Sequence, residues 1–354
     1  MTKYFKLLSP FRYIVLTISI VLITSSCQTW VKSIKQNQSD IPVISNSDYE
    51  ILISDLEKSI PQLMTDVKIP GLSIVLVNDS GIIWHGNFGF KDVMTMLPVD
   101  DQTVFQAASL SKVVFAYNVL KMADAGKLHL DTPLIKYAPG SYIEKEFLKI
   151  KDERFNQITA RMVLTHSSGI PDMNLFGTSV KINFTPGEQF SYSGEGFFLL
   201  QKIVEYIEGE PINEIMKKNV FIPLGMRNSS YVYEERFKDR LALGHNNKGE
   251  PGLFNLLLLS KGKKAHVGRS LSTTSEDYAR FLNALMNGKG LKSETYYEML
   301  SFQINAGAIN SDNIFWGLGI GIESRNSENC RDTCYWHLKC SNYWVRKLFF
   351  RISR

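Results

Sequence analysis

The sequence predicts an α+β protein in which an antiparallel sheet is flanked by helices and accompanied by an all-helical subdomain. Three observations support this prediction. A helix, a strand, a turn and a second strand are expected between Ser47 and Phe88; residues 103–290 have mainly helical patterning; and strand character returns at residues 316–322. Both ends of the chain then supply strands to the sheet, with a helical insertion between them.

The opening elements follow from capping and turn signals. Ser47-Asp48-Tyr49-Glu50 has the pattern of a capping box, and apolar residues at helical spacing continue to Leu63, so we expect a helix there. Residues 72–77 are short, apolar and β-branched, which is typical of a buried strand. Asp79-Ser80-Gly81 predicts a tight turn into a second strand over residues 82–88.

The middle of the chain predicts a series of helices. One starts at Ser109 and ends at Gly126, a residue suited to the position just after a helix. A short helical segment covers residues 161–164, a strongly apolar helix covers residues 196–208, and an amphipathic helix opened by Thr274 or Ser275 covers residues 275–286.

The start of the chain resembles a targeting segment. Lys3, Lys6 and Arg12 precede an apolar stretch at residues 13–23, which is short for a membrane span, and Thr24-Ser25-Ser26-Cys27 follows. We expect residues 1–27 to be a lipoprotein-type signal peptide with Cys27 as the lipidated residue. An ordinary signal peptide and an uncleaved anchor remain alternatives.

All three alternatives place the rest of the chain outside the cytoplasm, and the lipoprotein interpretation anchors it to a bacterial membrane at the periplasm or cell surface. Residues 28–47 are polar and suit a linker, so the folded domain is expected over residues 48–354, with residues 340–354 as an atypical basic tail.

The charge pattern excludes a nucleic-acid partner as the expected function. The 354 residues carry a net charge of +5, but residues 28–330 hold 31 Lys and Arg against 34 Asp and Glu. The excess is confined to the two ends, so the body lacks the basic face that a polyanion requires.

The remaining cysteines do not predict a metal site. Cys330, Cys334, His337 and Cys340 have spacings that match no common zinc site, so we expect neither a metal nor another cofactor. A Cys330–Cys334 disulfide stays open.

Ser109-Leu110-Ser111-Lys112 is the strongest candidate for chemistry. A serine at a helix start with a lysine three residues later puts both side chains on one face, where the amine can activate the hydroxyl. Four residues alone fit an N-cap serine equally well. The pattern recurs at Ser260-Lys261-Gly262-Lys263, which no apolar helix follows, and that copy is interpreted as a loop.

Several further stretches resemble the serine β-lactamase and penicillin-binding-protein superfamily, specifically its class C-like branch, from about residue 51 to residue 337. The resemblance lies in their residues and their order. The stretches are Pro70-Gly71-Leu72-Ser73-Ile74-Val75, Phe105 to Lys112, Leu164-Thr165-His166-Ser167-Ser168-Gly169, Pro186-Gly187-Glu188-Gln189-Phe190-Ser191-Tyr192-Ser193, Pro223-Leu224-Gly225-Met226 and Trp316-Gly317-Leu318-Gly319.

The resemblance implies a catalytic group. Ser109 would attack an acyl carbonyl, Lys112 would hold its proton network, and Tyr192 would relay the proton and activate water. A tyrosine working at neutral pH would need a cation such as Lys112 to lower its pKa. The oxyanion hole would pair the N–H of Ser109 with that of Cys340 on the edge strand of the sheet.

Two departures from the family pattern affect this interpretation. The second motif is usually Tyr-x-Asn, but Gly194 stands at the third position and offers no amide, which favours an esterase or a peptidase with altered recognition over a β-lactamase. The third motif reaches Trp336-His337, but Lys339 then occupies the position of its glycine. We therefore expect a frameshift or truncation that removes the final strands and the C-terminal helix.

Other hypotheses are weaker. An α/β-hydrolase is excluded because the sequence has no Gly-x-Ser-x-Gly. His166 is the main rival base, although its loop favours a structural role, and no pattern gives a partner to the four histidines His85, His129, His245 and His266.

The sequence thus predicts a serine hydrolase acting through an acyl-enzyme on an ester, amide or β-lactam carbonyl, with a small molecule or a peptidoglycan peptide as substrate. The alternative is an inactive or misfolded lipoprotein that retains part of the fold without catalysis.

Overall fold

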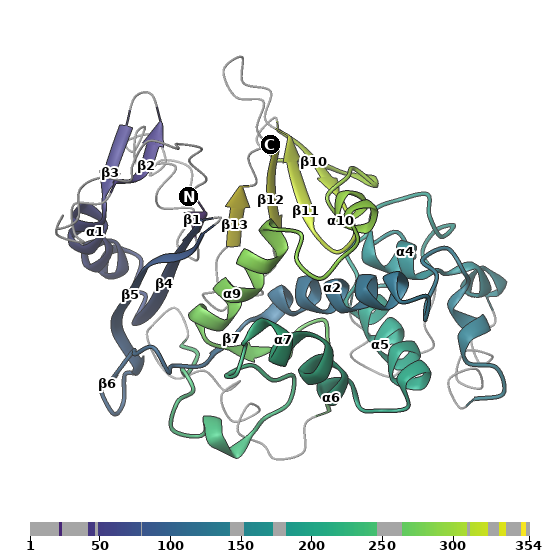
Figure 1. Ribbon diagram of the computed structural model, residues 1–354, viewed down its shortest axis with the longest axis horizontal. Helices are drawn as coiled ribbons and strands as arrows, with labels where there is room; N and C mark the ends of the chain where they lie inside the picture. Colours follow the sequence, from purple (N-terminus) through teal and green to yellow (C-terminus); the bar gives the residue numbers. More distant parts are fainter. Residues whose placement is uncertain are drawn as a thin grey trace.

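The computed structural model describes residues 21–22, 42–46, 49–78, 80–141, 152–172, 182–245, 264–309, 312–324, 333–337 and 348–351. All of its helices but one gather around a central helix, and two separate sheets stand beside them (Figure 1). Four sheets are present in the described residues. Their strands, in spatial order, are β1 (Val21–Leu22), β4 (Gly71–Asn78), β5 (Gly81–Asp92) and β6 (Leu97–Pro98); β13 (Leu348–Arg351), β12 (Thr333–His337), β11 (Gly321–Ser324), β10 (Asp312–Trp316) and β9 (Ile304–Ile309); β2 (Pro42–Asn46) and β3 (Tyr49–Leu52); and β7 (Phe105–Gln106) and β8 (Ser272–Thr273).

Within the described residues every helix except α1 lies between β6 and β9, as the sequence predicts. The helices are α1 (Ile53–Asp66), α2 (Ser111–Asp124), α4 (Ala160–Leu164), α5 (Gly194–Glu208), α6 (Ile212–Met216), α7 (Ile222–Leu224), α9 (Ser275–Met286) and α10 (Ser293–Met299), with short 3₁₀ turns that include η3 (Ala108–Leu110). The α+β class is therefore confirmed.

Both ends of the chain supply strands, but they form two sheets rather than one. No ladder joins the N-terminal and C-terminal sheets within the described residues, although β1 and β13 lie next to each other between them. β1 comes from the segment expected to be a signal peptide and pairs in parallel with β4.

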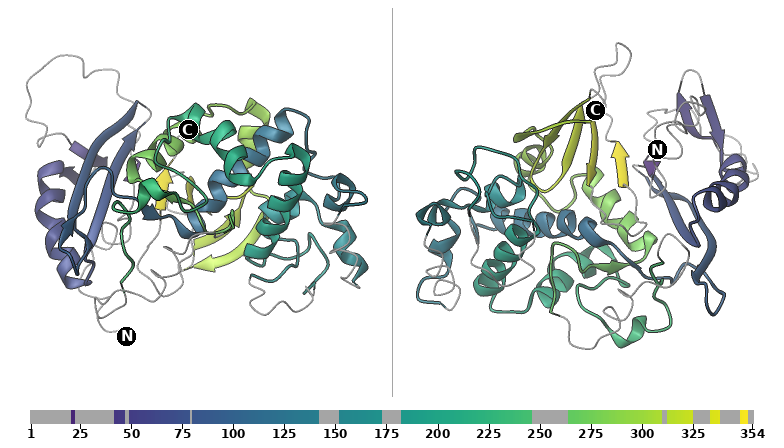
Figure 2. Two further views of the ribbon diagram at one scale, coloured as in Figure 1. Left: turned by 90° about the horizontal axis from the view of Figure 1, so that it is seen from below. Right: turned by 180° about the vertical axis from the view of Figure 1, so that it is seen from behind.

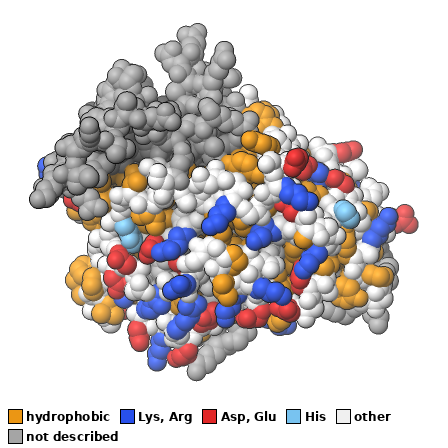
Figure 3. All heavy atoms as spheres, in the orientation of Figure 1, with side chains coloured by type: hydrophobic (Ala, Val, Ile, Leu, Met, Phe, Trp, Pro, Cys, Tyr) orange, Lys and Arg blue, Asp and Glu red, His pale blue; other side chains and the backbone are white. Residues whose placement is uncertain are grey.

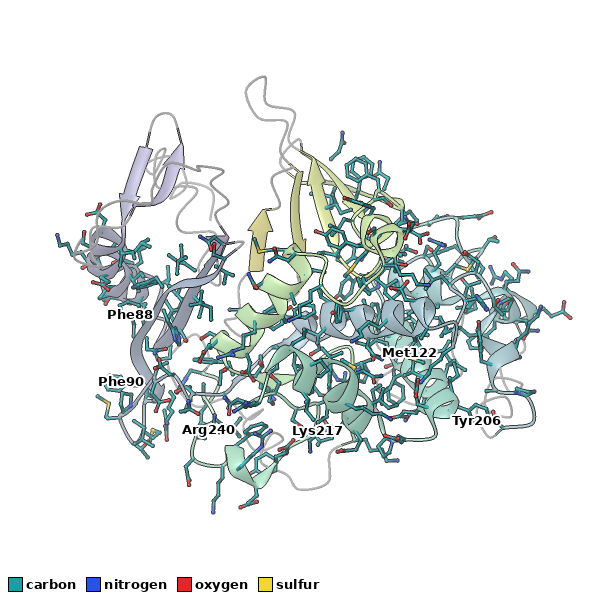
Figure 4. The ribbon with its side chains drawn as sticks, viewed as in Figure 1. Phe88, Phe90, Met122, Tyr206, Lys217 and Arg240 are labelled. Carbon is teal, nitrogen blue, oxygen red and sulfur yellow. The ribbon has the colours of Figure 1, made fainter. Side chains whose placement is uncertain are left out.

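The hairpin of β4 and β5 is covered on both faces. Successive side chains of a strand point to opposite faces, so Ile74 and Leu76 pack with α1, whereas Val75 and Val77 belong to the main core beside α9. Figure 2 shows α1 along the outer face of this sheet. Phe88 on β5 packs against the α1 side (Figure 4). Burial on both faces explains the continuous apolar run in β4.

Two expected boundaries are wrong. The first helix begins at Ile53, not at the capping box, because the four preceding residues form β3 and pair with β2, with the β-branched Ile44 and Ile51 opposite each other. The strand expected over residues 316–322 is interrupted by a turn in which the N–H of Gly317 donates to the Ile320 carbonyl at 2.8 Å.

Helix α2 is the centre of the main core. It is buried on nearly all sides, including the polar Ser111 and Lys112, and the chain leaves it through Gly126 at φ +70°. The turn between β10 and β11 rests on this helix. A Cβ on Gly319 would lie 2.3 Å from the Ala116 Cβ, and Gly319 itself has φ +83°.

The other predicted helices agree with the structure to within two residues, as α4, α5 and α9. None of the helices in the described part of the chain is both long and apolar enough to cross a bilayer. On the face shown in Figure 3, basic and acidic side chains are interspersed.

Candidate active site

The backbone that presents Ser109 is strained. β7 pairs with β8 and leads into the 3₁₀ turn η3, in which Ala108 has φ +45°, a conformation that non-glycine residues rarely adopt. The hydroxyl of Ser111 donates to the Ala108 carbonyl and its oxygen accepts from the N–H of Leu271 at 3.0 Å. Ser109 is therefore held, partly exposed, in a turn directly before α2 rather than as the first residue of that helix.

Lys112 lies beneath this turn and is 2% exposed. Its Nζ donates to the carbonyl of Gly268 at 2.7 Å and reaches the Ser109 Oγ at 3.4 Å. The short bond to Gly268 fixes the position of the amine, which therefore stays within 3.4 Å of the Ser109 hydroxyl. The predicted pairing of serine and lysine is thus present in the geometry.

Tyr192 completes the group. Its hydroxyl is hydrogen-bonded to the Ser109 side chain, and the Lys112 Nζ lies 4.7 Å from the centre of its ring. Burial raises the pKa of Tyr192 well above 10; the bond to Ser109 lowers it and the negative charge of Asp172 raises it. A net lowering of this pKa, which work as a phenolate at neutral pH would need, is not seen, because burial outweighs the bond to Ser109.

The loop that carries Tyr192 is fixed by His166. This fully buried ring stacks on Tyr192 with the ring centres 4.2 Å apart, and its Nδ1 accepts from the N–H of Ser193 at 3.0 Å. Ser193 in turn caps α5 by accepting from the N–H of Gly196. His166 therefore positions the tyrosine loop, as its structural interpretation predicts.

His266 supports the lysine and was missed in the sequence. Its Nδ1 accepts from the N–H of Gly268 at 3.1 Å, on the residue whose carbonyl binds Lys112. Burial, and then the charges of Arg269 and Lys112, lower the pKa of His266 to about 3. In the described part of the chain its buried Nε2 has no hydrogen-bond partner. A neutral His266 imidazole therefore holds the glycine that binds the Lys112 ammonium.

An acidic side chain also borders the site. The Asp172 carboxylate accepts from the N–H of Gly194 at 2.9 Å, and the backbone carbonyl of Asp172 accepts from the same N–H at 3.2 Å. A Cβ at position 194 would lie 3.4 Å from the Asp172 Oδ1. The carboxylate thus lies against the glycine that departs from the family motif.

A second polar cluster lies between the β4–β5 hairpin and the start of α9. We call it the His85 cluster, and it shows that His85 has partners that the sequence did not reveal. The His85 Nε2 lies 3.0 Å from both serine hydroxyls, its Nδ1 lies 3.3 Å from Asp101, Asn87 donates to Asp101 at 2.6 Å, and one serine donates to Asn87 at 2.7 Å. Its members are Ser73, His85, Asn87, Asp101 and Ser275.

Several predicted site residues cannot be placed. Cys27, Cys340 and the second copy of the serine–lysine pattern lie outside the described residues. His337 ends β12, where it pairs with Leu348 of β13. The expected edge position of this strand is wrong, because part of the basic tail forms β13 and covers it.

Comparison with known proteins identifies the family of this chain. Residues 56–338 match the model of the Beta-lactamase family. Penicillin-binding protein 4 of Amycolatopsis lactamdurans is 28% identical over 246 residues, which cover 62% of this chain and 60% of the relative. The Beta-lactamase of Providencia stuartii is 26% identical over 262 residues, covering 70% and 63%. The chain thus spans less than two thirds of either relative.

The fold is shared with solved structures. The octameric penicillin-binding protein homologue from Pyrococcus abyssi superposes with a TM-score of 0.68 at 24% identity, covering 80% of this chain and 67% of that one. The family model, the relatives and the fold agree, and the chain belongs to the Beta-lactamase family.

Proposed function

We propose that this protein is a serine hydrolase that forms an acyl-enzyme at Ser109 and acts as an esterase or as a peptidase of the D-alanyl-D-alanine type. One observation carries the proposal: the Ser109 hydroxyl is within reach of the Lys112 Nζ and is bonded to the Tyr192 hydroxyl. These groups supply what nucleophilic acyl transfer needs, namely a nucleophile, a phenol that relays its proton and a cation beside both.

The first step forms the acyl-enzyme. The Ser109 Oγ bonds to the carbonyl carbon of the substrate while its proton passes to the Tyr192 oxygen, and the phenolic proton passes from Tyr192 to the leaving group. The bond from the carbonyl carbon to the leaving group breaks, and the leaving group departs with one proton. The N–H of Ser109, at the amino end of the turn before α2, is the oxyanion donor that the described residues supply.

The second step returns the enzyme to its starting state. Water attacks the acyl carbon and gives a proton to the Tyr192 oxygen, while the phenolic proton passes to the Ser109 Oγ as its bond to the acyl carbon breaks and the acid is released. Because its pKa is raised, Tyr192 is a neutral phenol at rest, so it acts first as a hydrogen-bond donor that passes on a proton rather than as a standing phenolate.

Position 194 bears on the substrate. Gly194 has no side chain to bind a substrate amide, and the Asp172 carboxylate occupies the space next to it. Esters require no such amide contact, so we rank small esters above β-lactams as substrates of this site.

A fluorophosphonate probe tests the proposal. Attack by Ser109 on phosphorus expels fluoride and leaves a stable adduct that peptide mass spectrometry assigns to one residue. We expect one adduct at Ser109, none in Ser109→Ala, and full labelling in the matched control Ser275→Ala. A folded protein that stays unlabelled would instead support the alternative of a non-catalytic lipoprotein.

We also propose that Cys27 carries a lipid that holds the protein at a bacterial membrane outside the cytoplasm. The support is the basic, apolar and small-residue order that precedes Cys27. Incorporation of labelled palmitate in cells, lost in Cys27→Ala and retained in Cys334→Ala, is the expected result. Equal labelling of both variants would refute the anchor.

A further inference from the structure

The Lys112 amine is held by a backbone segment, residues 265–268, that lies in no helix or strand. The Gly268 carbonyl at the end of this segment accepts from the Lys112 Nζ at 2.7 Å, and the same Nζ lies 3.4 Å from the Ser109 Oγ. No ladder of backbone hydrogen bonds fixes such a segment. The place of the amine beside the serine therefore depends on the side chains that hold residues 265–268.

Gln201 on α5 holds the first part of this segment with both ends of its amide. The side chain is 1% exposed, its Nε2 donates to the Ala265 carbonyl at 3.0 Å, and its Oε1 accepts from the N–H of Val267 at 3.0 Å. One backbone partner is an acceptor and the other a donor, so a single orientation of the amide satisfies both. The Nε2 also donates to Glu205, one turn later on α5, at 3.1 Å. Residues 265–267 are thus tied to α5 at two backbone positions.

His266 holds the last residue of the segment. Its Nδ1 accepts from the N–H of Gly268 at 3.1 Å, and its own N–H donates to the Ser270 hydroxyl at 2.9 Å. The ring is packed closely against the backbone, because a Cβ on Gly268 would lie 2.9 Å from the His266 Cε1. Gly268 is therefore bonded at its N–H by His266 and at its carbonyl by Lys112.

Helix α5 connects this segment to the other reacting group. Ser193 caps the start of α5 and directly follows Tyr192, and Gln201 lies about two turns further along the same helix. One helix therefore sets the positions of the tyrosine loop and of the segment that binds Lys112.

We propose that Gln201 and His266 are positioning residues that align the Lys112 amine with Ser109 by fixing the backbone of residues 265–268. The inference rests on the proposed function, because it concerns the lysine of the same site. Neither residue is asked to touch the substrate. A displacement of a reacting group by about 1 Å can slow a reaction up to about a hundredfold, so a loosened segment should be visible in the rate.

The rate at which a fluorophosphonate labels Ser109 tests the proposal. Gln201→Met keeps the approximate length of the side chain but loses both bonds to the segment, and His266→Leu loses the acceptor for Gly268; each should slow labelling about tenfold. His266→Asn places an Oδ1 acceptor where the Nδ1 lies and should restore the rate to within about threefold of wild type. The matched control, His85→Leu, makes the same substitution outside the site.

A second measurement separates alignment of the amine from a general loss of structure. A residue that acts through Lys112 has nothing to align once the amine is gone. Gln201→Met and His266→Leu should therefore change the slow residual labelling of Lys112→Met by less than about twofold. A general disturbance of the site would slow labelling equally with and without the amine.

The outcomes distinguish this inference from the proposed function. If wild type is labelled at Ser109 but either variant labels within threefold of it, or slows labelling equally in the Lys112→Met background, the inference alone is wrong. If the folded wild-type protein is not labelled at Ser109, the proposed function is wrong and the inference falls with it.

Discussion

The nucleophile centre of Ser109, Lys112 and Tyr192 and the His85 cluster both bring a serine hydroxyl to a basic nitrogen. By composition the His85 cluster has the more familiar set, because it holds serine, histidine and aspartate. The two differ in where the serine hydrogen is directed. Ser73 donates to the Asn87 amide oxygen at 2.7 Å, so this hydroxyl is engaged away from the imidazole.

The backbones of the two regions differ as well. Ser73 lies in the regular strand β4 with α9 packed against it, whereas Ser109 follows a residue at φ +45° and is partly exposed before α2. The His85 cluster joins a sheet to a helix, whereas the nucleophile centre presents a hydroxyl at a partly exposed position. Residue types alone do not identify a nucleophile; hydrogen-bond direction and backbone conformation do.

The largest effect is expected from the amine. Lys112→Met keeps the length of the side chain but removes the charge and the donor, so phosphonylation of Ser109 should slow about a thousandfold. The matched change in the other cluster, His85→Leu, should leave the rate within about threefold. Comparable losses in both variants would contradict the division of roles. Both rates are measured by quenching the labelling reaction at successive times and determining the labelled fraction by intact-mass spectrometry.

Tyr192→Phe should have the next largest effect. It removes the hydroxyl but keeps the ring that stacks on His166, so turnover should fall about a hundredfold while the melting temperature changes little. Accumulation of acyl-enzyme in the variant, seen by mass spectrometry, would show that the phenol also serves deacylation. Turnover within threefold of wild type would remove Tyr192 from the chemistry.

The pH dependence of the free energy of unfolding tests His266, the residue that supports the nucleophile centre. His266 has a folded pKa of about 3 against 6.5 in the unfolded chain, so below pH 6.5 the unfolded state takes up the proton first. The stability it contributes is complete above pH 6.5 and declines as the pH falls towards 3, by up to ~1.4 kcal/mol per unit. His266→Asn keeps an acceptor for Gly268 and should flatten that decline in urea unfolding measured at pH 6.5 and 4.5; an unchanged slope would contradict it.

The smallest effect concerns the His85 cluster itself. His85→Ala removes the ring that joins Ser73, Ser275 and Asp101, so the free energy of unfolding should drop by about 2 kcal/mol. The fluorophosphonate should still label Ser109 below the transition temperature. A stability equal to wild type would show that the cluster does not hold the hairpin to α9.

The sequence predicts the long periodic elements well, because apolar spacing and capping residues are local signals. Helices α5 and α9 end within two residues of their expected bounds. The predicted start of the first helix is wrong because the residues before Ile53 pair with β2, and this pairing overrides the capping box at Ser47. The prediction of a continuous strand over residues 316–322 is wrong because the turn that interrupts it packs against α2, which is distant in the sequence.

The site shows the same division. The residues Ser109, Lys112 and Tyr192 could be named from motif order, and the structure brings them together. Gly268 contributes backbone groups, its carbonyl to Lys112 and its N–H to His266, and these carry no residue-type signal. Asp172 lies far from Ser109 in the sequence, so only the fold reveals that the two share a site.

The close approach of Gly319 to α2 affects how substitutions at this position would behave. Any side chain at that position would meet the Ala116 Cβ, on the helix that carries Lys112. Every substitution there would therefore push on the helix that aligns the reacting amine. A comprehensive mutational survey would show an intolerant site with no chemical group to explain it, and its origin would be mechanical.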